Sequence, residues 1–100
     1  MSTFNVTKSA FSDLIAIGQY TEKEWGRKQR NTYLKQIDSC FNQIARNPKL
    51  GTRCDYIRTG YRKFPQGSHI IFYRKNNEGV VNIVRILHKN MDVVSKFDEK

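Results

Sequence analysis

Apolar side chains recur every three or four positions in the first half of the chain, the spacing of one face of an α-helix. Two such stripes follow one another: Phe11, Leu14, Ile15 and Gly18, then Tyr33, Leu34, Ile37, Phe41, Ile44 and Ala45. Thr7 can cap the first helix, and Gly26 interrupts the pattern before the second begins near Arg27. Asn47-Pro48 should end the second helix, because the residue before proline resists helical geometry. Helices joined this closely are expected to form an antiparallel hairpin.

The second half changes to the two-residue alternation and β-branched or aromatic content that favour strands. Segments 61–65, 68–74 and 80–87 read as three strands of an antiparallel meander, and 3–7 as a short N-terminal strand. Segment 91–100 carries Val93, Val94 and Phe97 and is expected to be a docked tail.

Together these elements predict one α+β domain over residues 1–100, with the helical hairpin packed on one face of a twisted antiparallel sheet that the first strand joins. The other sheet face should be partly exposed or covered by something else, so we look for function there.

Composition narrows the class of protein. Hydrophobic residues make up 38% of the chain, yet no apolar run approaches the roughly 20 residues of a membrane span. No secretion signal begins the chain, so a cytoplasmic location is expected. Cys40 and Cys54 show no metal-ligand spacing, and Cys40 fits a helical apolar stripe, so two free thiols are expected. Neither a metal, a cofactor nor a small-molecule substrate is expected.

The formal net charge is +9, from 18 Lys and Arg against 9 Asp and Glu. Residues 53–89 hold eight of these cations and two acids, a net of +6. Such a surface favours an anionic partner, either nucleic acid or an acidic protein segment, although a merely solvated surface would have the same sign.

Several motifs, in order along about 80 residues, resemble ParE-type toxins of the RelE/ParE toxin–antitoxin superfamily. The resemblance starts with residues 25–31 and 33–34 at the turn into the second helix, and continues with Asn47-Pro48 and Gly51. It is most specific in segments 60–65, 67–69, 71–73, 84–88 and 91–92. Each motif alone is modest evidence for the family, but the set of motifs in this order is strong evidence.

The resemblance implies the same fold and a toxin that acts by binding rather than by catalysis. It implies DNA gyrase as the target, and a ParD-like antitoxin whose C-terminal segment wraps the toxin. A basic, half-covered sheet would suit an acidic, partly disordered chain that buries apolar side chains there. Direct binding to nucleic acid is not expected.

Relatives on the RelE side cut messenger RNA on the ribosome, and that activity is the alternative. A nuclease site could draw on His69, Arg85 and His88 as the groups that move protons or hold phosphate. Both histidines stand at strand ends, where bonds to backbone groups are the more common role. Arg85 has apolar neighbours, so we expect it to bond a carbonyl or a carboxylate such as Asp92. The segment after the last strand, residues 89–94, suits packing better than phosphate chemistry.

The contact surface for antitoxin or target is predicted on the basic strands. Tyr61-Arg62-Lys63-Phe64 interleaves aromatic and cationic side chains, which suits stacking and pairing but also an ordinary strand with two different sides. Trp25 is expected to anchor the helix turn rather than to make a contact. The predicted binding residues are Tyr61, Arg62, Lys63, Phe64, Tyr73, Arg74, Arg85 and Lys89.

Overall fold

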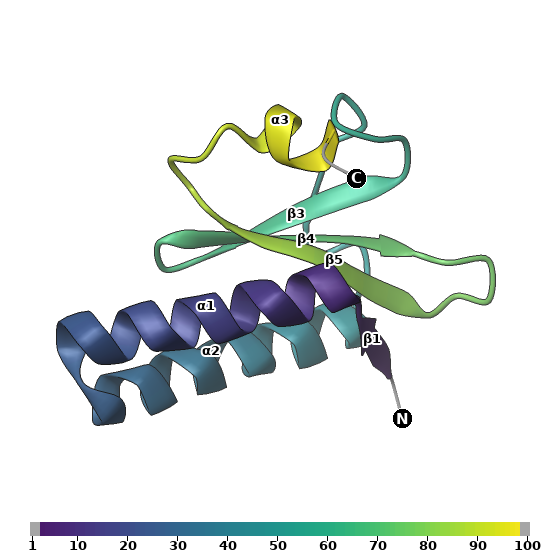
Figure 1. The fold of residues 1–100 in the computed structure, drawn as a ribbon. Coiled ribbons are helices and arrows are strands. Elements are labelled where there is room, and N and C mark those ends of the chain that lie inside the picture. The colour runs from purple at the N-terminus through teal and green to yellow at the C-terminus, as the bar shows by residue number, and fades with distance from the viewer. Residues whose placement is uncertain (1–2, 99–100) are drawn as a thin grey trace.

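The structure, a computed structural model, describes residues 3–98 as two long helices, a five-stranded sheet and a short C-terminal helix (Figure 1). The elements in chain order are β1 (Phe4–Val6), α1 (Lys8–Trp25), α2 (Arg27–Arg46), β2 (Thr52–Arg53), β3 (Tyr61–Gln66), β4 (His69–Lys75), β5 (Val81–His88) and α3 (Val93–Asp98). The predicted α+β class is confirmed. The three meander strands fall within one or two residues of the predicted segments.

The helical hairpin is set by the residues at its ends. The hydroxyl of Thr7 accepts a hydrogen bond from the Ala10 N–H at 3.1 Å, which caps α1 as predicted. Gly26 alone links the two helices, at a φ of 93° that glycine adopts without strain. Asn47 ends α2 directly before proline. The two helices therefore lie side by side and antiparallel.

The sheet has the strand order β1-β5-β4-β3-β2, and β3, β4 and β5 are its three longer strands. Neighbours pair antiparallel except β1, which pairs parallel with β5 from Phe4↔Val81 to Val6↔Ile83. The expectation that the first strand joins the sheet is confirmed, but the sheet is mixed rather than wholly antiparallel. Hydrophobic alternation along a strand carries no information on the direction of a partner some 77 positions away.

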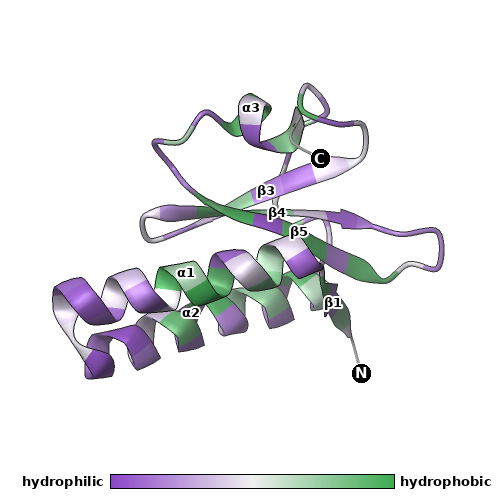
Figure 2. Ribbon diagram, viewed as in Figure 1, coloured by the Kyte–Doolittle hydropathy of each residue, from purple (hydrophilic) through white to green (hydrophobic). Residues whose placement is uncertain are grey.

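The main core lies between the helices and the sheet. Ile37, Phe41 and Ile44 of α2 pack there against side chains from the central strands, including Ile71 and Ile83. Figure 2 shows the apolar residues of both helices gathered in their middle sections, beside the sheet, whereas the far ends are hydrophilic. Burial of this kind is the dominant favourable term in folding.

A second core covers the opposite face of the sheet. Phe97 of α3 packs edge-on against Tyr61 and Phe72, with ring centroids 5.6 and 5.2 Å away, and Cys54 and Leu87 complete the buried cluster. The expectation of an open face is therefore wrong for the centre of the sheet. Val93 and Phe97 stand one helical turn apart, so the predicted docked tail forms a short amphipathic helix that seals it.

The two cysteines lie in different cores. Cys40 belongs to the helix-side cluster and Cys54 to the cluster beneath α3, so the sheet separates them. Both are free thiols, and burial raises the pKa of each. Cys40 therefore acts as the small buried hydrophobe that its helical stripe predicted. None of the helices within residues 3–98 combines the length and apolar character that a membrane span needs.

Candidate functional site: a basic groove beside the C-terminal helix

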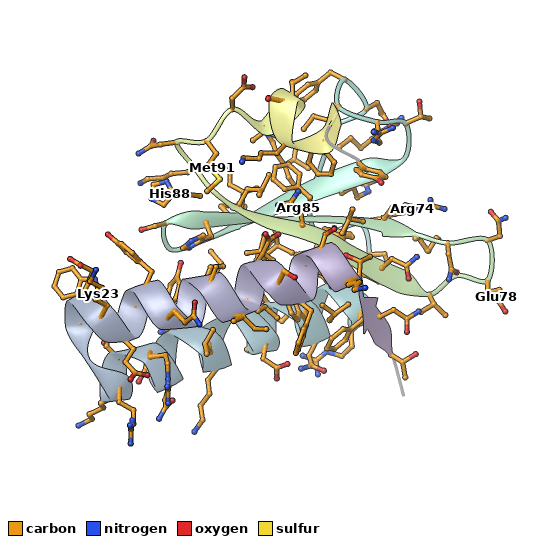
Figure 3. All side chains as sticks on the ribbon, viewed as in Figure 1. Lys23, Arg74, Glu78, Arg85, His88 and Met91 are labelled. Atoms are coloured by element: carbon orange, nitrogen blue, oxygen red, sulfur yellow. The ribbon has the colours of Figure 1, made fainter. Side chains whose placement is uncertain are left out.

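A groove of about 530 Å³ remains open where α3, the sheet and the start of α1 meet. Three of the predicted binding residues, Tyr61, Arg74 and Arg85, line it. Figure 3 shows Arg85 between the sheet and α3, with Arg74 further along the sheet. The structure thus brings together part of the predicted site, although on a smaller surface than an open sheet face would offer. The other lining residues are Thr7, Ser9, Arg58, Thr59, Val84, Lys96 and Phe97.

The groove is lined by cations from four separate segments. Arg74 and Arg85 come from β4 and β5, Arg58 from the loop before β3, and Lys96 from α3. Within residues 3–98, none of the lining side chains is acidic. The Nη2 of Arg58 donates to the Phe97 carbonyl at 2.7 Å, which ties the loop to α3 and holds that guanidinium at the rim. Low-dielectric walls lined by one sign of charge focus the field on anionic groups.

Arg85 is held by Asp13 of α1, the acid that sequence reasoning missed. Its Nε and Nη2 donate to the two Asp13 carboxylate oxygens at 2.9 and 3.0 Å, and the Ile86 N–H donates to the same carboxylate at 2.9 Å. The predicted role, pairing with a carboxylate, is confirmed. The suggested partner Asp92 is wrong, because Asp13 lies nearer the guanidinium than the chain after β5 does.

A short N-terminal strand explains why Asp13 is needed. β1 pairs with β5 only from Val81 to Ile83, so no strand of the described chain pairs with this edge of β5 beyond Ile83. The Thr7 hydroxyl donates to the Val84 carbonyl at 2.9 Å, and Asp13 accepts from the Ile86 N–H. The start of α1 thus satisfies the backbone groups that the strand leaves open.

Three predicted binding residues lie on the helix side and do not reach the groove. Tyr73 is fully buried: its hydroxyl donates to the Pro48 carbonyl and accepts from the Gly51 N–H, both at 2.7 Å. The prediction of a contact role for Tyr73 is therefore wrong, since the ring and hydroxyl fix the chain after α2. Arg62 donates to the Gly51 carbonyl at 2.8 Å, and Phe64 packs against the main core.

The two remaining predicted residues lie outside the groove. Lys63 points to the α3 side but donates to the Tyr56 hydroxyl at 3.0 Å. Lys89 is exposed just after β5. Both add to the positive charge of the surface without lining the groove.

The histidines form a separate cluster on the helix side. His69 Nδ1 lies 2.7 Å from the Tyr33 hydroxyl, and His88 Nδ1 accepts from the Asn90 N–H at 3.1 Å. The two rings meet edge to face, 5.5 Å apart. His69 pairs with His88 in the sheet, whereas Arg85, three positions earlier, pairs with Phe72 and belongs to the groove. The three residues of the nuclease alternative are therefore not brought into one site.

Burial, and then repulsion from His88, lowers the pKa of His69 below its ordinary value of 6.5. Because the unfolded chain takes up this proton more readily, folding stability should fall as the pH drops through 6.5, and be fully present above it. We expect the free energy of unfolding, measured with urea between about pH 8 and about pH 5, to decline less in His69→Gln than in the native chain. Parallel pH profiles for the two proteins would contradict this assignment.

Trp25 differs most from its predicted role. Its side chain is 72% exposed at the end of α1, so the prediction that it anchors the helix turn is wrong. The turn needs no anchor, because a single glycine makes it. Arg58, Lys96 and Asp13 are the other residues of functional interest that sequence reasoning did not select. No local pattern identifies Asp13 or Arg58, since each acts through a partner that is distant in the sequence.

Comparison with known families covers most of the chain. The family model described as "ParE toxin of type II toxin-antitoxin system, parDE" matches residues 4–93. Toxin ParE1 of Mycobacterium tuberculosis is 40% identical over 92 residues, which are 92% of this chain and 94% of that protein. Toxin ParE1 of Caulobacter vibrioides is 34% identical over 92 residues, again 92% of this chain and 94% of that protein.

Among solved structures, the fold is similar to that of the chromosomal ParDE toxin–antitoxin system from P. aeruginosa. The TM-score is 0.74 at 18% identity, over 88% of this chain and 96% of that one. At these identities the structural similarity supports the fold, and the sequence comparisons support the family.

Proposed function

This chain belongs to the ParE toxin family of type II toxin–antitoxin systems, and we propose that it arrests growth by binding DNA gyrase in the cytoplasm. A type II toxin has a protein antitoxin as its partner. We propose a ParD-like antitoxin here, with an acidic segment that enters the groove beside α3.

The observation that carries the antitoxin proposal is the charge of the groove. Arg58 and Arg74 face one opening together with Lys96, and none of the described residues that line it is acidic. Carboxylates of an extended segment can pair with such cations while its apolar side chains reach Val84 and Phe97. The partner that fits is a polypeptide with alternating acidic and apolar residues, encoded, we expect, by a small acidic reading frame beside this gene.

The arrangement of candidate catalytic groups supports binding rather than nuclease chemistry. His69 bonds Tyr33, and the His69–His88 pair lies three register positions away from the Phe72–Arg85 pair. The guanidinium of Arg85 is held by both oxygens of Asp13. Cleavage of RNA needs an acid, a base and a cation around one phosphate, and the separate partners of His69 and Arg85 do not favour such a site. The gyrase target follows from the family resemblance.

Induced expression tests the proposal against the RelE-like alternative. We expect filamented cells with a DNA-damage response, and inhibition of supercoiling when the purified toxin is added to purified gyrase. Intact messages and continued early translation should accompany the arrest. Arrest of translation within minutes with cleaved messages, abolished by a stably folded His69→Ala and His88→Ala double variant, would instead establish the ribonuclease.

A further inference from the structure

The far end of the helical hairpin carries exposed aromatic and basic side chains that the groove does not use. We call Tyr20, Lys23, Trp25, Arg27 and Lys28 the hairpin tip. Figure 1 shows α1 and α2 running past the sheet, and Figure 3 places Lys23 at their outer end. No residue from 22 to 36 is buried. This end of the molecule therefore contributes little to the core.

The aromatic residues of the tip are unusually exposed. Trp25 is 72% and Tyr20 62% exposed, although tryptophan buries more apolar surface than any other side chain when it is packed. Packing within the fold does not account for either ring. Exposed tryptophan, tyrosine and arginine are the residue types that most often dominate the energy of a protein–protein contact.

Hydrogen bonds and an ion pair hold the turn at the tip, so the two rings project from a backbone of defined geometry. Gly26 is the whole connection between the helices. Its N–H donates to the Glu22 carbonyl at 2.9 Å, and its own carbonyl accepts from the Arg30 N–H at 3.0 Å. An ion pair between Glu22 and Arg30 joins the two helices across the turn. A side chain held in advance loses less freedom on binding, which favours affinity.

Charge indicates the chemistry of the partner. Lys23, Arg27 and Lys28 surround the turn, while Glu22 is already paired with Arg30 and Glu24 is the remaining acid. A complementary surface is apolar at its centre and acidic at its rim.

Geometry favours a protein over nucleic acid. Residues 20 and 25 are five positions apart, so their side chains leave α1 roughly 140° apart. Rings that diverge in this way do not form a platform for successive bases, but they fit a pocket that encloses the tip from two sides.

We infer that the hairpin tip is the surface that grips the toxin's cellular target, a protein with an apolar pocket rimmed by carboxylates. The groove beside α3 is left to the antitoxin. The inference rests on the proposed function only for the existence of a protein target, whether or not that protein is gyrase.

Alanine substitution tests the tip, with an equally exposed aromatic residue as control. We expect Trp25→Ala, alone and with Tyr20→Ala, to weaken supercoiling inhibition at least about tenfold and to abolish growth arrest. Tyr56→Ala, which removes a ring that is 71% exposed elsewhere, should change neither. Thermal unfolding and antitoxin binding should match the native chain in all three variants. A Trp25→Ala, Tyr20→Ala protein that folds and still arrests growth would overturn the inference.

Trp25 is the one tryptophan of the sequence, so its fluorescence reports on the tip directly. Purified gyrase subunits without DNA should shift its emission to the blue and shield it from acrylamide, whereas the antitoxin should do neither. Shielding by the antitoxin, or by a DNA oligonucleotide alone, would overturn the inference.

If the native toxin arrests growth but leaves gyrase active, gyrase is the wrong target. The growth assay then decides on the tip alone: loss of arrest in Trp25→Ala supports it, and retained arrest overturns it.

Discussion

Replacing Asp13 by alanine should lower the free energy of unfolding by about 3 kcal/mol, a large share of the stability of a domain of this size. The side chains of Arg85 and Asp13 are only 20% and 14% exposed, so water cannot fully replace the lost carboxylate. The largely buried guanidinium would lose the carboxylate that accepts from two of its nitrogens, and the Ile86 N–H would lose its acceptor. Urea unfolding followed by circular dichroism measures the difference.

Two further variants separate the ion pair from the backbone bond. Asp13→Asn keeps an acceptor for the Ile86 N–H, and we expect it to cost about half as much as alanine. Adding Arg85→Met to Asp13→Ala removes the positive charge that has lost its carboxylate and should restore part of the stability. If Asp13→Ala unfolds within about 0.5 kcal/mol of the native chain, the edge of β5 does not depend on α1 as described.

The elements could be predicted because each depends on neighbours in sequence. A helical stripe reports which side of α2 is buried, and the glycine and proline at its ends act through their own backbone. For the same reason the turns of the β3–β4–β5 meander fell close to their predicted positions. The bond of His88 to a backbone N–H agrees with the role predicted for a histidine at a strand end, whereas His69 contacts the hydroxyl of Tyr33, a side chain 36 positions away.

The pairings between distant segments could not be read from local patterns. Asp13 and Arg85 are 72 positions apart, and neither differs in type or spacing from an ordinary surface residue. The parallel pairing of β1 and the sealing of the second face by α3 depend on where the chain returns in space. Tyr73 occupies a strand position that alternation places on the helix side, but nothing local shows that its hydroxyl fills a gap beside Gly51.

Trp25 shows how a preference for residue type can mislead. Tryptophan is usually well buried, and its place beside a turn suggested a packing role. A one-residue link keeps the helices so close that the last residue of α1 has no facing partner, and the ring is left in solvent. The geometry of the connection, rather than the identity of the residue, decides the outcome.

Reversing two charges in the groove should weaken the antitoxin complex by about 100-fold or more at moderate salt. The variant Arg58→Glu, Arg74→Glu places carboxylates where the acidic segment of the antitoxin should lie, so attraction becomes repulsion. Arg74→Glu alone should give a substantial part of the loss. Arg58 donates to the Phe97 carbonyl, so its replacement could disturb folding. The single Arg74→Glu variant keeps that hydrogen bond and therefore tests the groove without this risk. Calorimetric titration at several salt concentrations measures the affinity and its dependence on ionic strength.

The matched control reverses the same number of charges on the outer face of α2, as Lys35→Glu, Arg46→Glu. Both variants lower the net charge equally, from +9 to +5, since each reversal removes two units. If the groove is the antitoxin site, the α2 variant should lose less than about fivefold, because charges beyond the Debye length of about 8 Å are largely screened. The groove variant should also show a shallower dependence on salt, while the burial of apolar side chains keeps some affinity. Equal losses in the two variants would show that the antitoxin responds to the overall charge of the toxin, and that the groove beside α3 is not where it binds.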